Sequence, residues 1–287
     1  MYSASVNTDI VSRYTLKIVY DEYAESPREN QDNLGTMICW HNRYNLGDKH
    51  SYYSIEDFLS TLVRESADDR DIVEYVRDGK ADGLALEYSP ATHKWGLKSY
   101  NDFSKKWYTD CTYTPPINAE YGIISDDIIE RMTERDLLSF AERANVIMPL
   151  YFYDHSIQSI STESFRGRAH HANWDSGTVG FVYVSNKDIA KEYGDTSPNN
   201  IEKAKQLISS EVVTYDCYLR GDCYGFQLYK DGDEVDSCWG FIGSFNDAKE
   251  AVRSYLPEDA VAIIDRAEYG DDEPEYSPGA EFIEQGD

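Results

Sequence analysis

The residues of this chain best suited to chemistry are a few histidines with carboxylates nearby and one cysteine. His41, His155, His170 and Asp175 are the polar side chains best placed to line a catalytic cleft, because imidazole and carboxylate together can transfer protons. The consecutive Asp-His-Ser at 154–156 cannot form the hydrogen-bonded relay of a catalytic triad. A His/Asp cleft around His41, His155 and Asp175 is therefore one hypothesis, without a motif to support it.

The same residue types could also hold a metal ion. The candidate ligands are His155, His170 and His171, with Asp154 and Asp175 near them. Imidazole and carboxylate bind Zn²⁺ and non-haem metals. The spacing matches no known ligand pattern, and adjacent histidines normally point in different directions. We therefore expect no metal and no other cofactor, and solvated histidines are the simpler interpretation.

Cys238 lies in the segment Asp-Ser-Cys-Trp-Gly-Phe, which is similar to the nucleophile segment of papain-type cysteine proteases. That nucleophile needs a helix N-terminus to lower its thiol pKa, whereas Cys238 falls in the second arm of a predicted hairpin. Papain-type enzymes also carry their histidine downstream, and the last histidine here is His171. A strand whose Cys and Trp pack in a core is the favoured interpretation.

The chain as a whole is strongly acidic. It has 53 Asp and Glu against 27 Lys and Arg, a formal net charge of -26. Nucleic-acid binders show a basic stripe, and the nearest match, Lys105-Lys106 beside Trp107, is too short. Anionic membranes would repel the chain. We therefore expect no direct nucleic-acid binding and no membrane binding. A basic protein surface is the expected partner, with solubility alone as the alternative explanation of the charge.

Carboxylates are densest in two segments, which are the candidate partner-binding surface. One is 65–82 and the other runs from Asp271 to Glu275. The partner-binding candidates within the first are Asp68, Asp69, Asp71, Glu74 and Asp78.

The five cysteines indicate a reducing compartment. Their number is odd, their spacing is wide, and the first ten residues have no apolar core of a signal peptide. We expect five reduced thiols and a location in the host cytoplasm. The sequence does not determine the oligomeric state.

The order of strand and helix signals along the sequence predicts an α+β fold with a mostly antiparallel sheet and flanking amphipathic helices. Hydrophobic residues make up 41% of the chain, enough for a core. Strands are predicted at 15–20, 35–40, 146–153, 178–184 and 261–264. Helices are predicted from the caps Ser54, Ser125, Ser185 and Asn246. Residues 1–13 are predicted to be a loose lead-in.

Two elements carry the clearest signals. Residues 198–220 place nearly all their apolar side chains, with Glu211 among them, on one stripe, and Gly221 follows where a C-terminal glycine belongs. Residues 223–241 contain Asp231-Gly232-Asp233 between two strand patterns, a strong hairpin signal.

The prolines at 115 and 116 suggest a joint between two halves. The predicted regions are an N-terminal α+β region at 1–116 and a C-terminal α+β region at 117–270. A disordered acidic tail is predicted at 271–287, because it is rich in acidic residues, Pro and Gly.

Several segments together resemble an uncharacterised family of acidic proteins encoded by bacteriophages and other mobile elements. They are DNLGTM at 32–37, WHNRYNLGD at 40–48, LYFYDHS at 150–156, WDSGTVGFVYVS at 174–185, YDCYLRGD at 215–222 and DSCWGFIG at 236–243. The resemblance spans most of the chain from Asp21 to Gly243. It implies a mobile-element origin, and it assigns no role to any His, Asp or Cys.

Origin and charge together favour a non-catalytic protein that binds and inhibits a host nucleic-acid-acting or defence protein. Counter-defence or anti-restriction by a DNA mimic is the leading hypothesis, because an acidic surface can imitate the phosphate array. An enzyme that processes a small molecule or nucleotide in a His/Asp cleft is the alternative. A non-catalytic accessory protein of phage DNA metabolism is a second alternative.

Overall fold

The computed structural model describes residues 2–7, 13–155, 157–167, 176–266 and 281–282. The chain forms two units. Unit 1 comprises residues 1–49, 148–184 and 197–287, and unit 2 comprises 50–147 and 185–196. The predicted boundary at residue 116 lies inside unit 2. The units follow spatial packing, which brings together segments that are far apart in the sequence.

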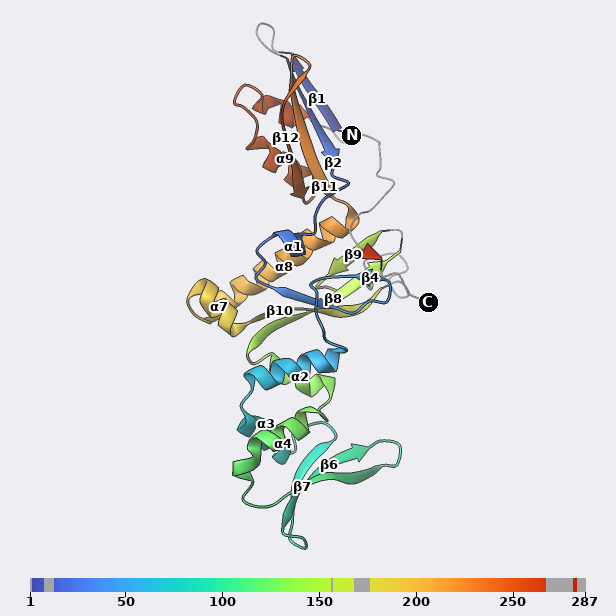
Figure 1. Cartoon of the computed structure of the whole chain (residues 1–287), viewed down its shortest axis with the longest axis vertical. Coiled ribbons are helices and arrows are strands. Elements are labelled where there is room, and N and C mark those ends of the chain that lie inside the picture. The colour runs from blue at the N-terminus through green and yellow to red at the C-terminus, as the bar shows by residue number, and fades with distance from the viewer. Residues whose placement is uncertain (1, 8–12, 156, 168–175, 267–280, 283–287) are drawn as a thin grey trace. The chain divides into compact units, whose positions relative to one another are not determined.

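The strands of unit 1 are β1 (Tyr2–Asn7), β2 (Arg13–Tyr20), β3 (Thr36–Cys39), β4 (Tyr44–Asn45), β8 (Asn145–Asp154), β9 (Gln158–Ser161), β10 (Ser176–Ser185), β11 (Cys223–Lys230), β12 (Asp233–Ile242) and β13 (Glu281–Phe282). Its helices are α1 (Pro27–Asn30), α8 (Pro198–Arg220), α9 (Phe245–Arg253) and the 3-10 helix η2 (Val261–Arg266). Figure 1 labels most of these elements.

The strands of unit 2 are β5 (Leu84–Ser89), β6 (Lys94–Asn101) and β7 (Lys106–Tyr113). Its helices are α2 (Ile55–Ser66), α3 (Asp69–Arg77), the 3-10 helix η1 (Ile117–Glu120), α4 (Tyr121–Ile129), α5 (Glu134–Ala141) and α7 (Asn186–Tyr193). The predicted fold class is confirmed: the protein is α+β with mostly antiparallel strands.

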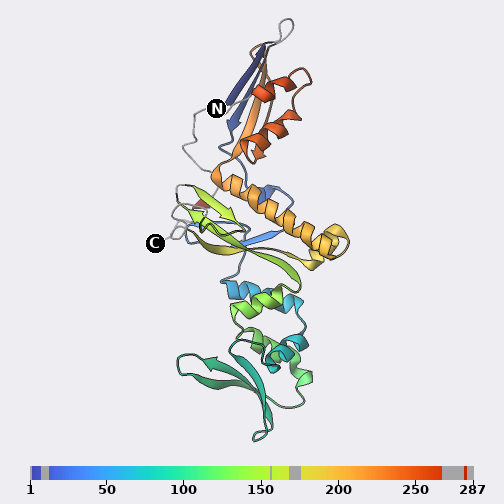
Figure 2. The same cartoon turned by 180° about the vertical axis from the view of Figure 1, so that it is seen from behind.

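Sheet A has the strand order β1-β2-β11-β12. Alternate side chains of β2, Leu16 and Ile18 among them, are buried, and together with Phe226 and Leu228 of β11 they pack against α9 and η2. This alternation is typical of a sheet with one covered face. The helices that cover this face of sheet A are visible from behind in Figure 2.

Two predictions were wrong in this sheet. Residues 2–7 form β1, which pairs with β2, rather than a loose lead-in. Residues 261–266 form the 3-10 helix η2 rather than a strand, since Ile263 and Ile264 are buried against the sheet face. The predicted hairpin is confirmed. Asp231 and Gly232 have φ of 55° and 100°, as a two-residue type I′ turn requires.

Sheet B has the strand order β3-β10-β8-β9, and the predicted strands within it are confirmed. The predicted helix 198–220 is confirmed as α8, which contacts β9 (Figure 1). Gly221 ends α8 with φ of 78°, the left-handed geometry expected of a C-terminal glycine.

In unit 2, α2 packs on α4 and α5, and α3 packs on α4 and β5. The side chain of Ser54 caps α2 by accepting a hydrogen bond from the Asp57 amide at 3.2 Å, as predicted. Ser125 is not a cap: it lies buried inside α4, which begins four residues earlier at Tyr121, and its hydroxyl donates to Asp69.

The sheet β5-β6-β7 was not predicted. Thr133 caps α5 by accepting a hydrogen bond from the Asp136 amide, and Ser244, rather than the predicted Asn246, caps α9.

The predicted acidic tail at 271–287 lies largely outside the described residues. Its two described residues, Glu281 and Phe282, form β13 and pair with β4.

Candidate functional site

The first candidate surface is the start of α3, where three of the predicted partner-binding residues are exposed. Asp68 caps the helix by accepting a hydrogen bond from the Arg70 amide at 2.8 Å. Asp69 accepts one from the Ser125 hydroxyl at 2.5 Å, and Asp71 follows in the first turn. Among the ion pairs of the described residues, none involves Asp68, Asp69 or Asp71. We call these three residues the α3 acidic cluster.

The other two predicted partner-binding residues are paired with cations of their own segment. The Glu74 carboxylate lies 2.8 Å from Nε of Arg70 and 3.7 Å from Nη2 of Arg77. The Asp78 carboxylate lies 3.1 Å from Nζ of Lys80. Each of their charges is therefore paired with a neighbouring cation, whereas Asp68 of the α3 acidic cluster interacts with Arg70 only at longer range.

His41, the first of the predicted catalytic residues, is a half-buried ring in unit 1. Its Nδ1 accepts hydrogen bonds from the backbone amides of Arg43 and Tyr44, both at 3.2 Å. The ring stacks on Tyr44 and meets Phe152 edge-on, at 5.0 and 5.1 Å between centroids. Burial lowers the pKa of His41, and Asp154 opposes this. A neutral imidazole whose Nδ1 organises a turn accounts for this geometry.

Only His41 and His155 of the predicted His/Asp cleft are among the residues that the structure describes. Asp154 is paired with Arg43, and His155 is exposed at the end of β8, with its ring 6.2 Å from that of Tyr153. Asp175, His170 and His171 lie outside the described residues, as does the segment Asp271 to Glu275. No group of three or more His, Cys, Asp or Glu that could hold a metal occurs in the described ranges.

The described cysteines form no disulfide. Cys238 lies on strand β12. A nucleophile of the papain type would have to lie at a helix N-terminus.

A buried ion cluster in unit 1 was not predicted. Arg28, whose side chain is 3% exposed, donates from Nε and Nη2 to the two carboxylate oxygens of Asp48, at 3.0 and 2.6 Å. Its Nη1 lies 3.5 Å from Glu211 of α8. Glu211 in turn accepts the backbone amides of Leu34 and Gly35 at 2.7 and 3.0 Å. We call Arg28, Asp48 and Glu211 the Arg28 cluster.

Two turn-rich segments, near Asn33 and Asp48, supply contacts of the Arg28 cluster. Their polar groups are largely used within the protein: Asn33 donates to two backbone carbonyls, and Asp48 holds Arg28 and the Met37 amide. The sequence did contain one signal, because Glu211 is a charged residue on the otherwise apolar stripe of α8.

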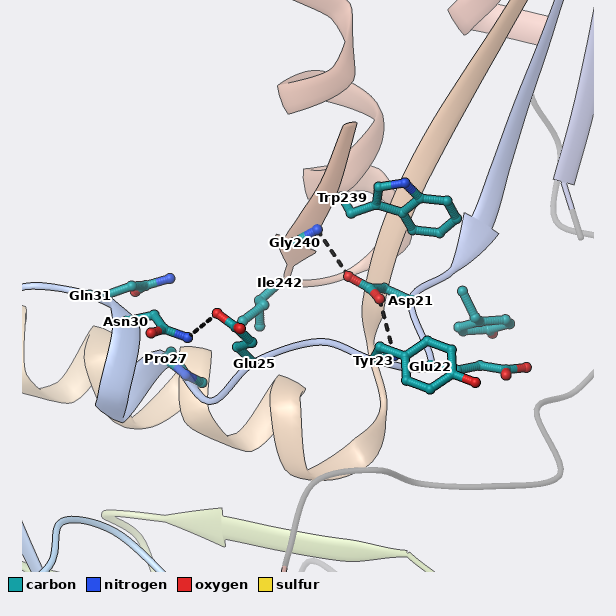
Figure 3. Close-up of a pocket in the computed structure, with 11 residues that line it drawn as sticks. Asp21, Glu22, Tyr23, Glu25, Pro27, Asn30, Gln31, Trp239, Gly240 and Ile242 are labelled. Atoms are coloured by element: carbon teal, nitrogen blue, oxygen red, sulfur yellow. Dashed lines mark hydrogen bonds between the residues drawn. The ribbon is translucent and has the colours of Figure 1, made fainter. Parts of the chain in front are cut away.

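A cavity of about 790 Å³ also lies in unit 1, between the end of β2, α1 and the end of β12. We call it the Asp21 cavity. Its lining residues are Tyr20, Asp21, Glu22, Tyr23, Glu25, Pro27, Asn30, Gln31, Trp239, Gly240 and Ile242. Figure 3 shows ten of these labelled, with Trp239 and Tyr23 on opposite sides of Asp21.

Asp21 fixes the shape of this cavity. Its side chain is largely buried and accepts hydrogen bonds from the backbone amides of Tyr23 and Gly240, both at 3.1 Å (Figure 3). Its own amide donates to Cys223 at 2.8 Å, which extends the pairing of β2 with β11. Asp21 thereby ties the loop after β2 to the end of β12.

Trp239 forms a flat aromatic wall of the cavity. A Cβ added at Gly225 of β11 would lie 2.1 Å from the indole ring, so the ring lies directly against this backbone. The side chain stays 48% exposed. The glycine therefore makes room for an indole that lies against β11 and is still half exposed beside the cavity. The prediction that Trp239 packs in a core was therefore wrong, because the ring is half exposed on β12.

Comparison with protein-family models, with curated proteins and with solved structures finds no match for the chain. The resemblance to acidic phage proteins therefore stays a prediction. Within the described part of the chain, no helix is both long enough and apolar enough to cross a membrane.

Proposed function

We propose that this chain is a binding protein that engages the basic surface of a host nucleic-acid-acting or defence protein and inhibits it. The observation that carries the proposal is the α3 acidic cluster: three exposed carboxylates within four residues, with no ion pair among the described residues. The resemblance to phage-encoded proteins supports the host cytoplasm as the place of action and counter-defence as the purpose.

The cluster lies at the start of a helix. The N-terminus of a helix carries a partial positive charge, which stabilises carboxylates there. Asp68 is the N-cap of α3, and Asp69 and Asp71 lie in its first turn. Duplex DNA presents one charge per ~1.7 Å of its axis. Closely spaced carboxylates without an ion pair in the described structure support imitation of a phosphate array by the cluster.

Such a surface acts mainly on the encounter between two proteins. Long-range fields raise association rates, and salt screens them: the screening length falls from about 10 Å at 0.1 M salt to about 3 Å at 1 M. We therefore expect the partner to associate faster at low salt.

The test begins with capture of partners from host lysate, identified by mass spectrometry, and continues with association rates for the purified pair. Asp69→Asn with Asp71→Asn removes two charges that take part in no ion pair among the described residues, and the Asn oxygen can still accept from Ser125. Glu74→Gln with Asp78→Asn removes two charges that are already paired. We expect the first double variant to slow association several-fold more than the second. A partner whose association rate ignores both salt and the first double variant contradicts the proposal.

A further inference from the structure

We propose that the Asp21 cavity is a binding site for a guanidinium group, such as that of arginine. The cavity belongs to unit 1 and shares no residue with the α3 acidic cluster of unit 2. The proposal therefore does not depend on the proposed function, and the two can fail separately.

The charge of the lining selects a cation. Asp21, Glu22 and Glu25 supply three carboxylates, and the lining contains no Lys or Arg. Glu22 and Glu25 are exposed, so their charges face solvent and are available to a ligand. An anionic ligand would be repelled, and an apolar one would leave these carboxylates without compensation.

The aromatic wall selects a flat cation. The indole of Trp239 is held against Gly225, is about half exposed and lines the cavity, and Tyr20 and Tyr23 also line the space. A cation above an indole ring is attracted by the ring quadrupole. Guanidinium is planar, stacks on aromatic faces and donates in a fork that matches carboxylates, whereas an ammonium is a compact and strongly hydrated point charge.

The remaining polar groups fit a donor-rich ligand. Asn30 donates from Nδ2 to Glu25 at 2.6 Å, so its oxygen can serve as an acceptor beside that carboxylate (Figure 3). Guanidinium has five N–H donors and no acceptor. The cavity volume of about 790 Å³ is of the size that holds a small ligand, so there is room for the aliphatic part of an arginine as well.

Calorimetric titration of the full chain tests the proposal with N-acetyl-arginine methylamide as probe. The citrulline analogue, which has the same shape without the charge, and the lysine analogue are the ligand controls. We expect binding of the arginine probe, at least about fivefold weaker binding of the lysine probe, and no binding of the citrulline probe. Equal binding of the citrulline and arginine probes, or binding of neither, would overturn the proposal.

Protein variants distinguish specific binding in the Asp21 cavity from general electrostatic attraction to an acidic chain. Glu22→Gln with Glu25→Gln should weaken arginine binding about tenfold, and Trp239→Leu about fivefold. Gly225→Ala should weaken it too, because the added Cβ displaces the indole while every lining residue stays. Glu134→Gln with Glu142→Gln removes the same charge as the Glu22 and Glu25 pair, from exposed positions of the other unit, and should leave arginine binding unchanged. Equal weakening by the two charge-matched pairs would show general electrostatics and contradict the site.

Two sources can supply the guanidinium, and a second pair of probes distinguishes them. A Gly-Gly-Arg-Gly-Gly peptide that binds more tightly than agmatine points to an arginine of a partner protein. Agmatine that binds as tightly as the peptide, or more tightly, points to a free small molecule. Either result supports the guanidinium site, and failure of both probes contradicts it.

Discussion

The Arg28 cluster of unit 1 and the α3 acidic cluster of unit 2 use the same residue type in opposite ways. Asp48 and Glu211 are held around a buried arginine and accept backbone amides. Asp68, Asp69 and Asp71 are exposed at a helix start, without an ion pair in the described structure. In the first group the carboxylates stabilise a fold, and in the second their charge faces solvent.

This difference shows that the acidity of the chain is not one property. A buried carboxylate must be paired and hydrogen-bonded, because an unpaired buried charge costs several kcal/mol. An exposed carboxylate costs little and contributes little to stability. Net charge alone therefore cannot indicate which acids serve recognition, whereas burial and pairing can.

Substitution of Arg28 should have the largest effect on stability. Arg28→Met leaves Asp48 and Glu211 without their cation in a buried setting, so the free energy of unfolding should fall by about 3–5 kcal/mol. Urea denaturation followed by far-UV circular dichroism measures this. Arg64→Met is the control, because Arg64 pairs with Asp126 at the surface of unit 2, and it should cost about 0–1 kcal/mol. Equal losses for the two variants would remove the distinction between buried and exposed pairs.

Asp136 tests whether burial, rather than the unit, decides the role of a carboxylate. It is 1% exposed in unit 2 and accepts from the Tyr75 hydroxyl at 3.0 Å and the Asp82 amide at 2.9 Å. Asp136→Ala should cost about 1–3 kcal/mol in denaturation experiments, because these donors lose their acceptor. Asp136→Asn keeps one acceptor oxygen and should cost less. If Asp136→Ala were as stable as the wild type, buried carboxylates would stabilise unit 1 but not unit 2.

The buried thiols predict a loss of stability at high pH. Burial is the largest cause that raises the pKa of Cys39 and Cys223 from 9.0 to about 12 each. Between about pH 9 and 12 the unfolded chain has lost these protons and the folded chain keeps them. Stability should therefore fall as pH rises, by about 1.4 kcal/mol per pH unit for each thiol. Denaturation at pH 9 and 10.5 checks this.

The matched control for the thiols is Cys39→Ala with Cys223→Ala, which should show a smaller loss over the same pH interval. An unchanged pH dependence in this double variant would assign the loss to other groups, such as the tyrosines.

The smallest stability effect is expected at the α3 acidic cluster. Asp69→Asn with Asp71→Asn should change the free energy of unfolding by less than about 0.5 kcal/mol, because both side chains are exposed and the contact with Ser125 can persist. The measurement is the same urea denaturation. A loss comparable to that of Arg28→Met would mean that these carboxylates are structural, and the comparison between the two clusters would fail.

Local patterns predicted the elements whose signals lie close together in the sequence. The apolar stripe and terminal glycine of α8, the Asp-Gly turn of the β11–β12 hairpin and the Ser54 cap of α2 each depend on residues within a few turns of one another. The exposed aspartates of α3 were found for the same reason, since a dense run of charges is visible without a structure.

Contacts between distant segments decided the rest. Strand β1 pairs with β2, and β5, β6 and β7 form a sheet of their own. Alternation of apolar and polar residues within a strand does not identify these partners. Arg28 and Glu211 are 183 positions apart in the sequence, and Trp239 becomes a cavity wall only because Gly225 lies beneath it. The sequence by itself determined the α+β class, the acidity and the most regular local elements, because these follow from composition and short-range periodicity. Only the tertiary structure decided which carboxylates are buried around an arginine and which face solvent, because burial depends on the packing of remote segments.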